Sequence, residues 1–392
     1  MKELRFSVCN EPSVVHEVLQ PFDRNRPPAA KVQLHWLPWD HQKQELTAMA
    51  IHGGGADVSQ VGGPMINDLI AMDALRPFAP IEIEALGGSA AFSPLTWQSP
   101  RLTSTGSIYA LPWIIDARAI YYWHDMLEAA GVDESTAFTS FEHMEETFQR
   151  LQASGVESPW ALALNGGPLI QPACTWIWGA GGDIGTETEL LILRPETLRG
   201  LRNFFSLYRY MPHANQPLGF AYTYQELFAR RQTAVTLGSL APFAAIRKSL
   251  PPDRQAQLGV ALAPGPLFAG SSSLVIWKNT RNEVDALKLV RYLLDAEGQK
   301  AYCLPGGYLP ARLSVLNEPP YTDDPHLKVF AQSALTGRTF AHIKFSGLFE
   351  DLLSAAIGRI WAKIIANPRI DLDPIILEEL EPIARRSSLW KE

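Results

Sequence analysis

The sequence predicts an α/β fold of two domains, and three observations lead to that prediction. The chain has 392 residues, more than one hydrophobic core usually supports, so two domains are expected. Strand-like and helix-like segments alternate through the N-terminal quarter, an order typical of a parallel sheet with helices on both faces. No single linker divides the chain, which indicates that the two domains share it discontinuously.

The N-terminal strands are defined by alternation and by their flanking turns. The segment 31–37, KVQLHWL, alternates with period two, as a half-buried strand should. Expected strands lie at 4–8, 31–37 and 56–61, with helices starting near Pro12, Asp40 and Pro64. Ligands of parallel sheets bind outside the carboxyl ends of the strands. The residues at those ends are therefore the first candidates for a binding site, and Trp36, inside its strand, is expected to face the core.

The central and C-terminal parts alternate less regularly. Residues 109–117 are expected to form a strand that leads directly into a helix over 118–130, which ends at Gly131. Thr139 and Glu142 predict a capping box at the start of the next helix. Further helices are expected at 195–210, 222–231 and 348–365, and further strands at 161–164, 233–237, 257–261 and 272–277.

Composition and charge exclude several classes of protein. The content of 46% hydrophobic and 19% charged residues is that of an ordinary folded protein. A net charge of -7 argues against a nucleic-acid partner, which needs a basic surface. Cys9, Cys174 and Cys303 are odd in number and far apart, so neither a disulfide framework nor a metal site is expected. No cofactor is expected, and no segment has the roughly 20 apolar residues of a spanning helix.

Catalytic motifs are absent from the sequence. Residues 238–241, GSLA, lack the spacing of a nucleophile elbow. Residues 178–182, WGAGG, lack the Lys and Ser or Thr of a phosphate loop. The prediction is therefore that the protein is not an enzyme. A two-carboxylate glycoside-acting enzyme stays open as an alternative, because Glu11, Asp40 and Asp116 could converge on a sugar.

Short motifs in a fixed order carry a family resemblance. They lie at 56–58, 75–78, 109–112, 121–131, 138–142, 232–235, 259–265, 295–299 and 304–310. In this order they resemble the family 1 extracellular solute-binding proteins of bacterial ABC importers, which include maltodextrin-binding proteins. Each motif alone is weak, but the resemblance covers nearly the whole chain. It departs from the family at 270–272, GSS, where many members have two glycines and an aromatic residue.

The resemblance implies a two-lobed periplasmic-binding-protein-like fold, each lobe a sheet flanked by helices. The first lobe would comprise 1–110 and 265–312, and the second 115–262 and 315–392. Hinge crossings are expected near 111–117, 262–268 and 310–315, because extended segments can absorb the backbone rotations of closure.

The implied function is capture of a small polar solute, foremost a carbohydrate, between two closing lobes, followed by delivery to the permease subunits of an ABC importer. A monomer outside the cytoplasm is expected, and the export signal of such a protein is not seen before Lys2. An amino sugar or polyamine stays open as the ligand, and a sensory or regulatory solute-binding module stays open as the function.

Sugar recognition requires flat aromatic surfaces for C–H faces, and acids, amides or backbone groups for hydroxyls. The expected ligand contacts are Glu11, Trp39, Asp40, Gln60, Gly62, Trp113, Asp116, Trp176, Trp178, Tyr222, Ser239, Ser271 and Tyr308. Each aromatic residue could instead be packed in a core, and Asp40 could be a helix N-cap. Asp116 is the strongest acidic candidate, because a charge between packed segments needs a partner or a ligand. The glycines at 179–182 would let a ligand approach the backbone beside Trp178.

Overall fold

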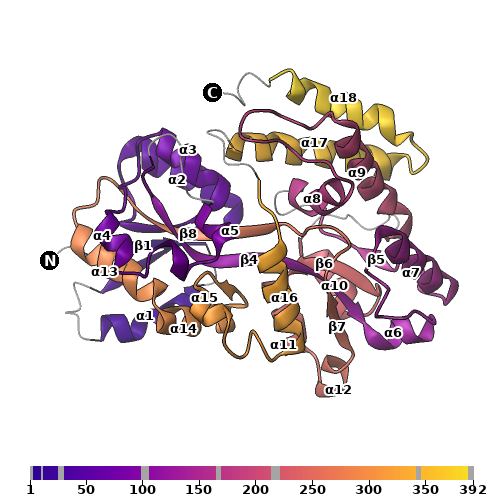
Figure 1. Cartoon of the computed structure of the whole chain (residues 1–392), viewed down its shortest axis with the longest axis horizontal. Helices are drawn as coiled ribbons and strands as arrows, with labels where there is room; N and C mark the ends of the chain where they lie inside the picture. The colour runs from indigo at the N-terminus through magenta and orange to yellow at the C-terminus, as the bar shows by residue number, and fades with distance from the viewer. Residues whose placement is uncertain are drawn as a thin grey trace. The chain divides into compact units, whose positions relative to one another are not determined.

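The computed structural model describes residues 3–9, 12–24, 31–98, 106–164, 169–212, 221–340 and 346–386, and Figure 1 labels its elements. The chain divides into two compact units. Unit 1 comprises Met1–Asp116, Gly270–Asp323 and His342–Gly347, and unit 2 comprises Ala117–Ala269, Asp324–Ala341 and Leu348–Glu392. Both units therefore draw on separate parts of the sequence.

The sheet of unit 1 has parallel strands at its centre. β1 (Leu4–Val8) pairs in parallel with β2 (Val32–Trp36) on one side and β3 (Val58–Gly62) on the other. β8 (Ala269–Ile276) runs antiparallel beside β3. Alternating strands and helices thus give the expected parallel arrangement, and a late strand extends it.

Helices of unit 1 cover this sheet. They are α1 (Pro12–Asp23), α2 (Trp39–His52), α3 (Gly63–Ala71), α4 (Pro80–Glu84), α5 (Pro94–Gln98), α13 (Glu283–Leu294), α14 (Ala296–Gly306) and α15 (Leu313–Leu316). Helices α2 and α3 pack together, and α1 packs against α14. Leu46, Ile66 and Val61 are fully buried where α2 and α3 meet the sheet. Burying side chains of this size stabilises the fold by roughly 1.5–3 kcal/mol each.

Trp36 was expected to face the core, but it is exposed. It ends β2, which lies at the edge of the unit 1 sheet, and 53% of its surface is exposed. Alternation along a strand distinguishes two faces but does not tell whether anything covers them. At an edge strand, one face of a large residue can stay in solvent.

β4 (Ala110–Trp123) is one continuous strand of 14 residues. Residues 118–123, which were expected to be helical, are therefore part of a strand. The helix α6 (His124–Ala129) begins only after Trp123. Ile120, Tyr121 and Trp123 are branched or aromatic side chains, which fit a pleated sheet better than a helix. They are also buried on both faces of the strand, so the sequence shows no period-two pattern.

The two ends of β4 belong to different units. In unit 1, Ile114 and Ile115 pair with β9 (Leu309–Pro310). In unit 2, the end of β4 pairs antiparallel with β6 (Val235–Ser239) and β7 (Leu258–Ala261). β6 in turn pairs in parallel with the short β5 (Trp160–Ala161). The boundary between the units at Asp116 thus falls inside one strand.

Most of unit 2 is helical. Besides α6, its helices are α7 (Phe141–Ala153), α8 (Ile170–Gly179), α9 (Pro195–Ser206), α10 (Ala221–Ala229), α11 (Leu240–Ser249), α12 (Pro252–Gln255), α16 (Pro325–Thr336), α17 (Ser346–Ala366) and α18 (Leu372–Ala384). Helix α9 packs on both α8 and α18. The N-cap of α7 is Ser140, whose Oγ accepts from His143 N at 3.1 Å. Thr139, the expected cap, donates to Thr136 O instead.

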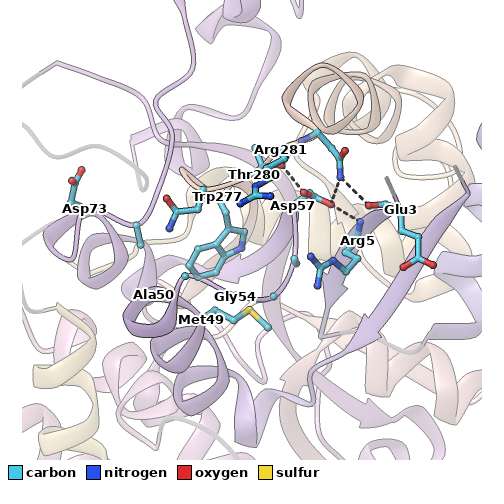
Figure 2. A pocket seen from close by; sticks show the side chains of 16 residues that line it. Glu3, Arg5, Met49, Ala50, Gly54, Asp57, Asp73, Trp277, Thr280 and Arg281 are labelled. Atoms are coloured by element: carbon cyan, nitrogen blue, oxygen red, sulfur yellow. Dashed lines mark hydrogen bonds between the residues drawn. The ribbon is translucent and has the colours of Figure 1, made fainter. Parts of the chain in front are cut away.

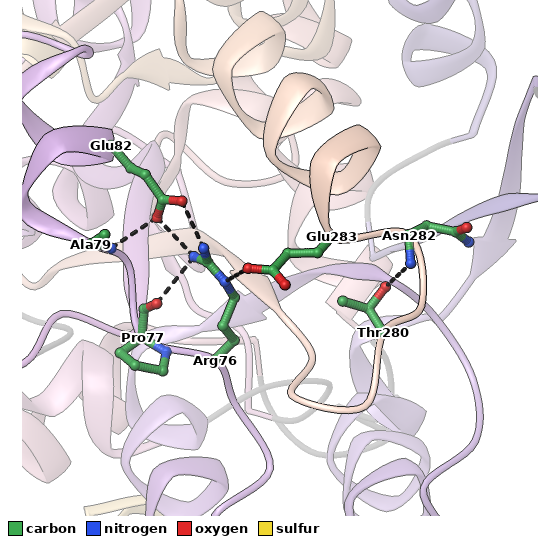
Figure 3. A network of polar contacts seen from close by, with 7 residues as sticks. All are labelled: Arg76, Pro77, Ala79, Glu82, Thr280, Asn282 and Glu283. Atoms are coloured by element: carbon green, nitrogen blue, oxygen red, sulfur yellow. Dashed lines mark hydrogen bonds and ion pairs between the residues drawn. The ribbon is translucent and has the colours of Figure 1, made fainter.

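A charged network fixes the segment after α3 within unit 1 (Figure 3). The Arg76 guanidinium donates to both carboxylate oxygens of Glu82, at 2.6 and 2.8 Å, and its Nε donates to Glu283 at 2.6 Å. Glu82 also accepts from Ala79 N at the start of α4. The hydrogen bonds from Arg76 hold the pKa of Glu82 below its usual value. Arg76 therefore joins α4 to the beginning of α13.

Candidate functional site

Trp39 lies at the carboxyl edge of the unit 1 sheet. It is the first residue of α2, and its ring passes over Gly62 at the end of β3. A Cβ atom on Gly62 would come within 3.3 Å of Cζ3 of the indole, so the missing side chain makes room for the ring. The ring remains 49% exposed. An accessible indole surface therefore stands where parallel sheets bind ligands.

Asp40 accompanies Trp39 in the first turn of α2. Its side chain is 73% exposed and lies 3.8 Å from His41. The N-cap position is Pro38, so Asp40 does not cap the helix. An acid in the first turn is favoured by the helix dipole, and its exposure leaves the carboxylate accessible to a ligand.

Gln60 is a structural residue and not an exposed amide, which corrects the expectation of a ligand contact. It is fully buried. Its Oε1 accepts from Cys9 N at 2.9 Å, and its Nε2 donates to Ser272 Oγ at 2.9 Å. The amide thus ties β1 to β8 across β3. Burial beside it raises the pKa of the Cys9 thiol to about 12, so this thiol is unreactive.

Ser271 lies one residue before the Ser272–Gly62 pair of the β3–β8 ladder. Its Oγ is buried and has no hydrogen-bond partner among the described residues. A buried hydroxyl without a partner is uncommon in folded proteins. Ser271 is consequently a polar group near the Trp39 edge that a ligand could satisfy.

Trp113 is a core residue of unit 1, contrary to expectation. It is fully buried and stacks on Tyr302 with ring centres 4.2 Å apart. Tyr302 stacks in turn on Tyr308 at 5.8 Å. Of these three rings, only that of Tyr308 is partly exposed. Asp116 is also partly buried, at the end of the unit 1 part of β4.

Trp176 belongs to the core of unit 2, which removes it as a ligand contact. It is 2% exposed. Its ring packs against Phe141, Trp160 and Phe204, with centres 5.2–6.2 Å apart. No face of the ring remains for stacking on a sugar.

Trp178 is also enclosed, at 5% exposure, but it takes part in a polar arrangement. Its Nε1–H donates to Asp183 Oδ1 at 2.9 Å, and Arg338 donates to the other oxygen of Asp183 at 2.6 Å. The Arg338 guanidinium lies 4.9 Å from the centre of the indole. Phe268 is nearly parallel to the indole, at 8° and 6.5 Å. These partners fix the ring in unit 2.

The glycines beside Trp178 serve packing and not ligand approach. A Cβ atom on Gly179 would come within 2.4 Å of the Phe141 ring, and one on Gly182 within 2.5 Å of the backbone of Thr197. Gly179 therefore lets α8 lie close to the start of α7, and Gly182 lets the chain after α8 lie close to α9. Only Gly181, with φ of 80° and no neighbour within 4 Å, faces open space.

Unit 2 holds a polar row that the sequence did not suggest. Arg118 on β4 donates to Gln171 Oε1 at 2.5 Å, and Gln171 Nε2 donates to Glu350 Oε1 at 2.8 Å. The Arg118 guanidinium lies 5.5 Å from the centre of the Phe268 ring. Ser239, an expected contact, pairs with Arg118 between β4 and β6. A charge within the apolar run 110–123 was the available signal for Arg118.

Two expected contacts lie outside the described residues, namely Glu11 and the side chain of Tyr222. Across the described ranges, no group of three or more His, Cys, Asp and Glu side chains is arranged to hold a metal ion. In the same ranges, the helices are too short or too polar for a membrane-spanning segment.

The sequence profile described as bacterial extracellular solute-binding protein matches residues 23–329. The match spans most of the 392 residues, and the chain belongs to this family. A Brucella abortus protein named as a binding protein is 25% identical over 328 residues, covering 80% of this chain and 76% of the relative.

Solved structures confirm the fold class. The GacH receptor of Streptomyces glaucescens, studied unliganded and with acarbose, has a TM-score of 0.84 at 16% identity and covers 99% of this chain and 98% of its own. Maltose-bound MalE3 of T. maritima has the same TM-score and identity, covering 98% of this chain and 100% of its own. The fold is thus that of the periplasmic binding proteins.

Proposed function

We propose that this protein binds a small carbohydrate outside the cytoplasm and delivers it to the permease subunits of an ABC importer. Family membership supports solute binding. Two structural relatives are described in complex with acarbose and with maltose. Both ligands are sugars, which supports a carbohydrate as the solute. Binding without chemical conversion and action as a monomer are parts of this proposal.

The exposed indole of Trp39 is the observation that carries the carbohydrate assignment. A flat, preorganised aromatic surface suits the apolar C–H face of a sugar ring, and its exposure would otherwise leave a large apolar group in water. The Ser271 hydroxyl and the Asp40 carboxylate supply polar partners in the same unit. Tyr308 can add a second ring at the end of its stack.

Unit 2 would contribute hydrogen bonds through Arg118, Gln171 and Glu350. The row combines a cation, an amide and an anion, so it can both donate to and accept from hydroxyl groups. A polyamine would need several acceptors without a neighbouring guanidinium. The row therefore favours a hydroxyl-rich solute, while an amino sugar remains a ligand to test.

The proposed ligand contacts differ from those expected from the sequence. Trp39, Asp40, Gly62, Asp116, Ser239, Ser271 and Tyr308 are retained, with Glu11 and Tyr222 as predictions, and Arg118, Gln171 and Glu350 are added. Gln60, Trp113, Trp176 and Trp178 are removed because their burial leaves no surface for a ligand. We also propose that the segments joining the units, β4 foremost, act as the hinge of ligand binding.

A thermal-shift screen tests the proposal. Maltose, maltotriose, acarbose, glucosamine, spermidine and amino acids are added at graded concentrations, and hits are measured by calorimetry. A ligand at a hundred times its Kd stabilises the protein by about 2.7 kcal/mol, which raises Tm by several degrees. We expect at least one sugar to do so and to be recovered unchanged by NMR. Stabilisation by spermidine alone, or release of a hydrolysed sugar, contradicts the proposal.

Oligomeric state is tested separately by light scattering during gel filtration. The mass of a single chain, with and without the identified sugar, is the expected result. A dimer that forms only with ligand would contradict the proposed monomer without affecting the carbohydrate assignment.

A further inference from the structure

The first turn of helix α2, which carries Trp39, has little local support. Its N-cap is Pro38, which makes no side-chain hydrogen bond to the turn, although a polar cap commonly stabilises the start of a helix. Across the described stretch 38–45, Gln42 is the only buried residue, at 6% exposure. The turn is therefore attached to the rest of unit 1 mainly through the side chain of Gln42.

The other end of α2 is anchored by apolar packing. Leu46 and Met49 are buried in the core of unit 1, and the helix ends at Gly53, whose N–H donates to Met49 O at 3.0 Å. Met49 and Trp277 also line a cavity of about 1030 Å³ at this end of the helix (Figure 2). Burial of apolar side chains thus fixes one end of α2, whereas the end that carries Trp39 depends on a polar side chain.

The Gln42 amide is fixed by two acceptors of the sheet. Its Nε2 donates to Gln60 O near the end of β3, at 3.3 Å, and to Cys9 Sγ directly after β1. A carbonyl oxygen can only accept, so the amide must direct its NH2 group to Gln60 and its Oε1 away from it. Oε1 lies beside Gly62, where a Cβ atom would come within 3.5 Å of it and 3.3 Å of the Trp39 ring. Gln42 and Trp39, three residues apart on one helix face, therefore rest on the same glycine.

We propose that Gln42 is a positioning residue, which holds the Trp39 ring in the orientation that stacks on the sugar; this inference rests on the proposed function. Without the two hydrogen bonds of Gln42, the uncapped first turn would occupy several positions, and the sugar would bind to only one of them. The apparent Kd rises by the inverse of the fraction in the competent position. Gln42 itself is enclosed, so its effect on affinity acts through Trp39.

Gln42→Met tests this role, because methionine fills a similar volume but cannot donate. Maltose, maltotriose, acarbose or glucosamine, whichever binds the wild type, is titrated by calorimetry. We expect the affinity to fall about three- to tenfold, less than in Trp39→Ala. In the Trp39→Ala background, Gln42→Met should cause no further loss, because no ring is left to position. Equal losses in both backgrounds, or an unchanged affinity in Gln42→Met alone, overturn the proposal.

Gln44→Met is the matched control. Gln44 is exposed on the same helix, so the same chemical change should leave the affinity unchanged. Circular dichroism confirms that each variant is folded under the conditions of the titration. Binding that weakens by the same factor in Gln44→Met and Gln42→Met would indicate a general effect on α2 and would overturn the assignment to Gln42.

Cys9 provides a second, milder test. Cys9→Ala removes one acceptor of the Gln42 amide and leaves the other, so the loss of affinity should be smaller than in Gln42→Met. Cys9→Ser supplies a hydroxyl that can accept from Gln42, so it should bind the sugar more tightly than Cys9→Ala. The opposite order contradicts a role for the hydrogen bonds of the amide.

A measurement without ligand separates this inference from the proposed function. The indole N–H signal of Trp39 in a nitrogen–proton correlation spectrum is assigned by its loss in Trp39→Phe. Gln42→Met should shift or broaden this signal and Gln44→Met should not, because only the former releases the first turn. If the signal responds in this way but no sugar binds the wild type, the proposed function fails and the positioning of the ring is retained. If a sugar binds the wild type, and Gln42→Met changes neither the signal nor the affinity, the positioning role fails and the proposed function is retained.

Discussion

Two tryptophans, Trp39 in unit 1 and Trp178 in unit 2, differ in how far their side chains are buried and in what they pack against. Trp39 begins a helix and lies over Gly62 with 49% of its surface exposed. Trp178 is 5% exposed, and it is fixed by Asp183, Arg338 and Phe268. About half of the surface of the first residue is accessible, whereas the second is enclosed.

The comparison separates a residue available to a ligand from one that holds its unit together. An enclosed aromatic ring contributes through buried area and satisfied polar atoms, so its removal should reduce stability. Removing an exposed ring that lies over a glycine should change the stability of the fold little, but such a ring can contribute to ligand binding. Both tryptophans were expected to contact the ligand for the same reason, namely that each is an aromatic residue near the end of a helix or strand. Only their packing in the structure distinguishes them.

Trp178→Ala should have the largest effect. Removing a buried Trp costs about 3–5 kcal/mol of stability, and here it also leaves the Asp183–Arg338 pair without its indole partner. Urea denaturation of the variant measures the loss. Trp178→Phe is the control, since it keeps a ring beside Phe268 but loses the Nε1–H bond, and it should cost less. A stable Trp178→Ala variant with weaker sugar binding would place Trp178 in the binding site.

Trp39→Ala should reverse this result. Loss of a stacking anchor typically costs about 2 kcal/mol of binding free energy, so affinity for the identified sugar should fall at least tenfold. Its stability should change by only about 0.5 kcal/mol, as for most surface positions. Trp36→Ala is matched, because Trp36 is 53% exposed in the same unit and should leave affinity unchanged. If Trp39→Ala binds normally, the exposed indole is not a ligand contact.

The sequence was sufficient where local pattern determines structure. The strands expected at 4–8, 31–37 and 56–61 correspond to β1, β2 and β3, because alternation and turn residues mark their ends. The same reasoning was wrong for 118–123, where burial on both faces of β4 removes the alternation. The order of the family motifs along the chain predicted the fold class, because many weak motifs in a fixed order are informative together.

The candidate site was less accessible to sequence reasoning. Gln60 and Trp113 have suitable chemistry, but their burial results from residues far away in the chain, such as Ser272 and Tyr302. Gln171 lies 53 residues from Arg118 and 179 residues from Glu350. Nothing local relates such positions. Residue type therefore suggested the kind of site, while tertiary packing decided its members.

Glycine replacements sharpen the comparison with smaller changes. Gly182→Ala would place Cβ against the Thr197 backbone, and overpacking of this kind costs about 1–3 kcal/mol. Gly62→Ala would press on Trp39, whose exposed ring can shift, and Gly62 has an ordinary φ of -69°. We expect Gly182→Ala to lose stability, and Gly62→Ala to lose mainly sugar affinity. Melting curves and calorimetry on both variants decide this, and equal stability losses would remove the distinction between the units.

The smallest expected effect is a pH dependence that originates in unit 2. His326 on α16 is largely buried, and burial lowers its pKa below the ordinary value of 6.5. Its Nε2–H donates to Leu258 O at 2.9 Å. Asp324, Arg247 and His124 are the charged or titratable groups that act on it. The net result is that the folded state prefers the neutral ring.

This preference sets the sign of the effect. Above about pH 6.5 the ring is neutral in both states, so His326 adds no pH dependence. Below pH 6.5 the unfolded chain takes up the proton more readily, so stability should fall with falling pH until the lowered folded pKa is passed. His326→Gln keeps a donor for Leu258 O but cannot titrate, and it should flatten denaturation midpoints between about pH 7 and 5. If the His326→Gln variant keeps the wild-type slope over this range, the acid sensitivity does not originate at this buried histidine of unit 2.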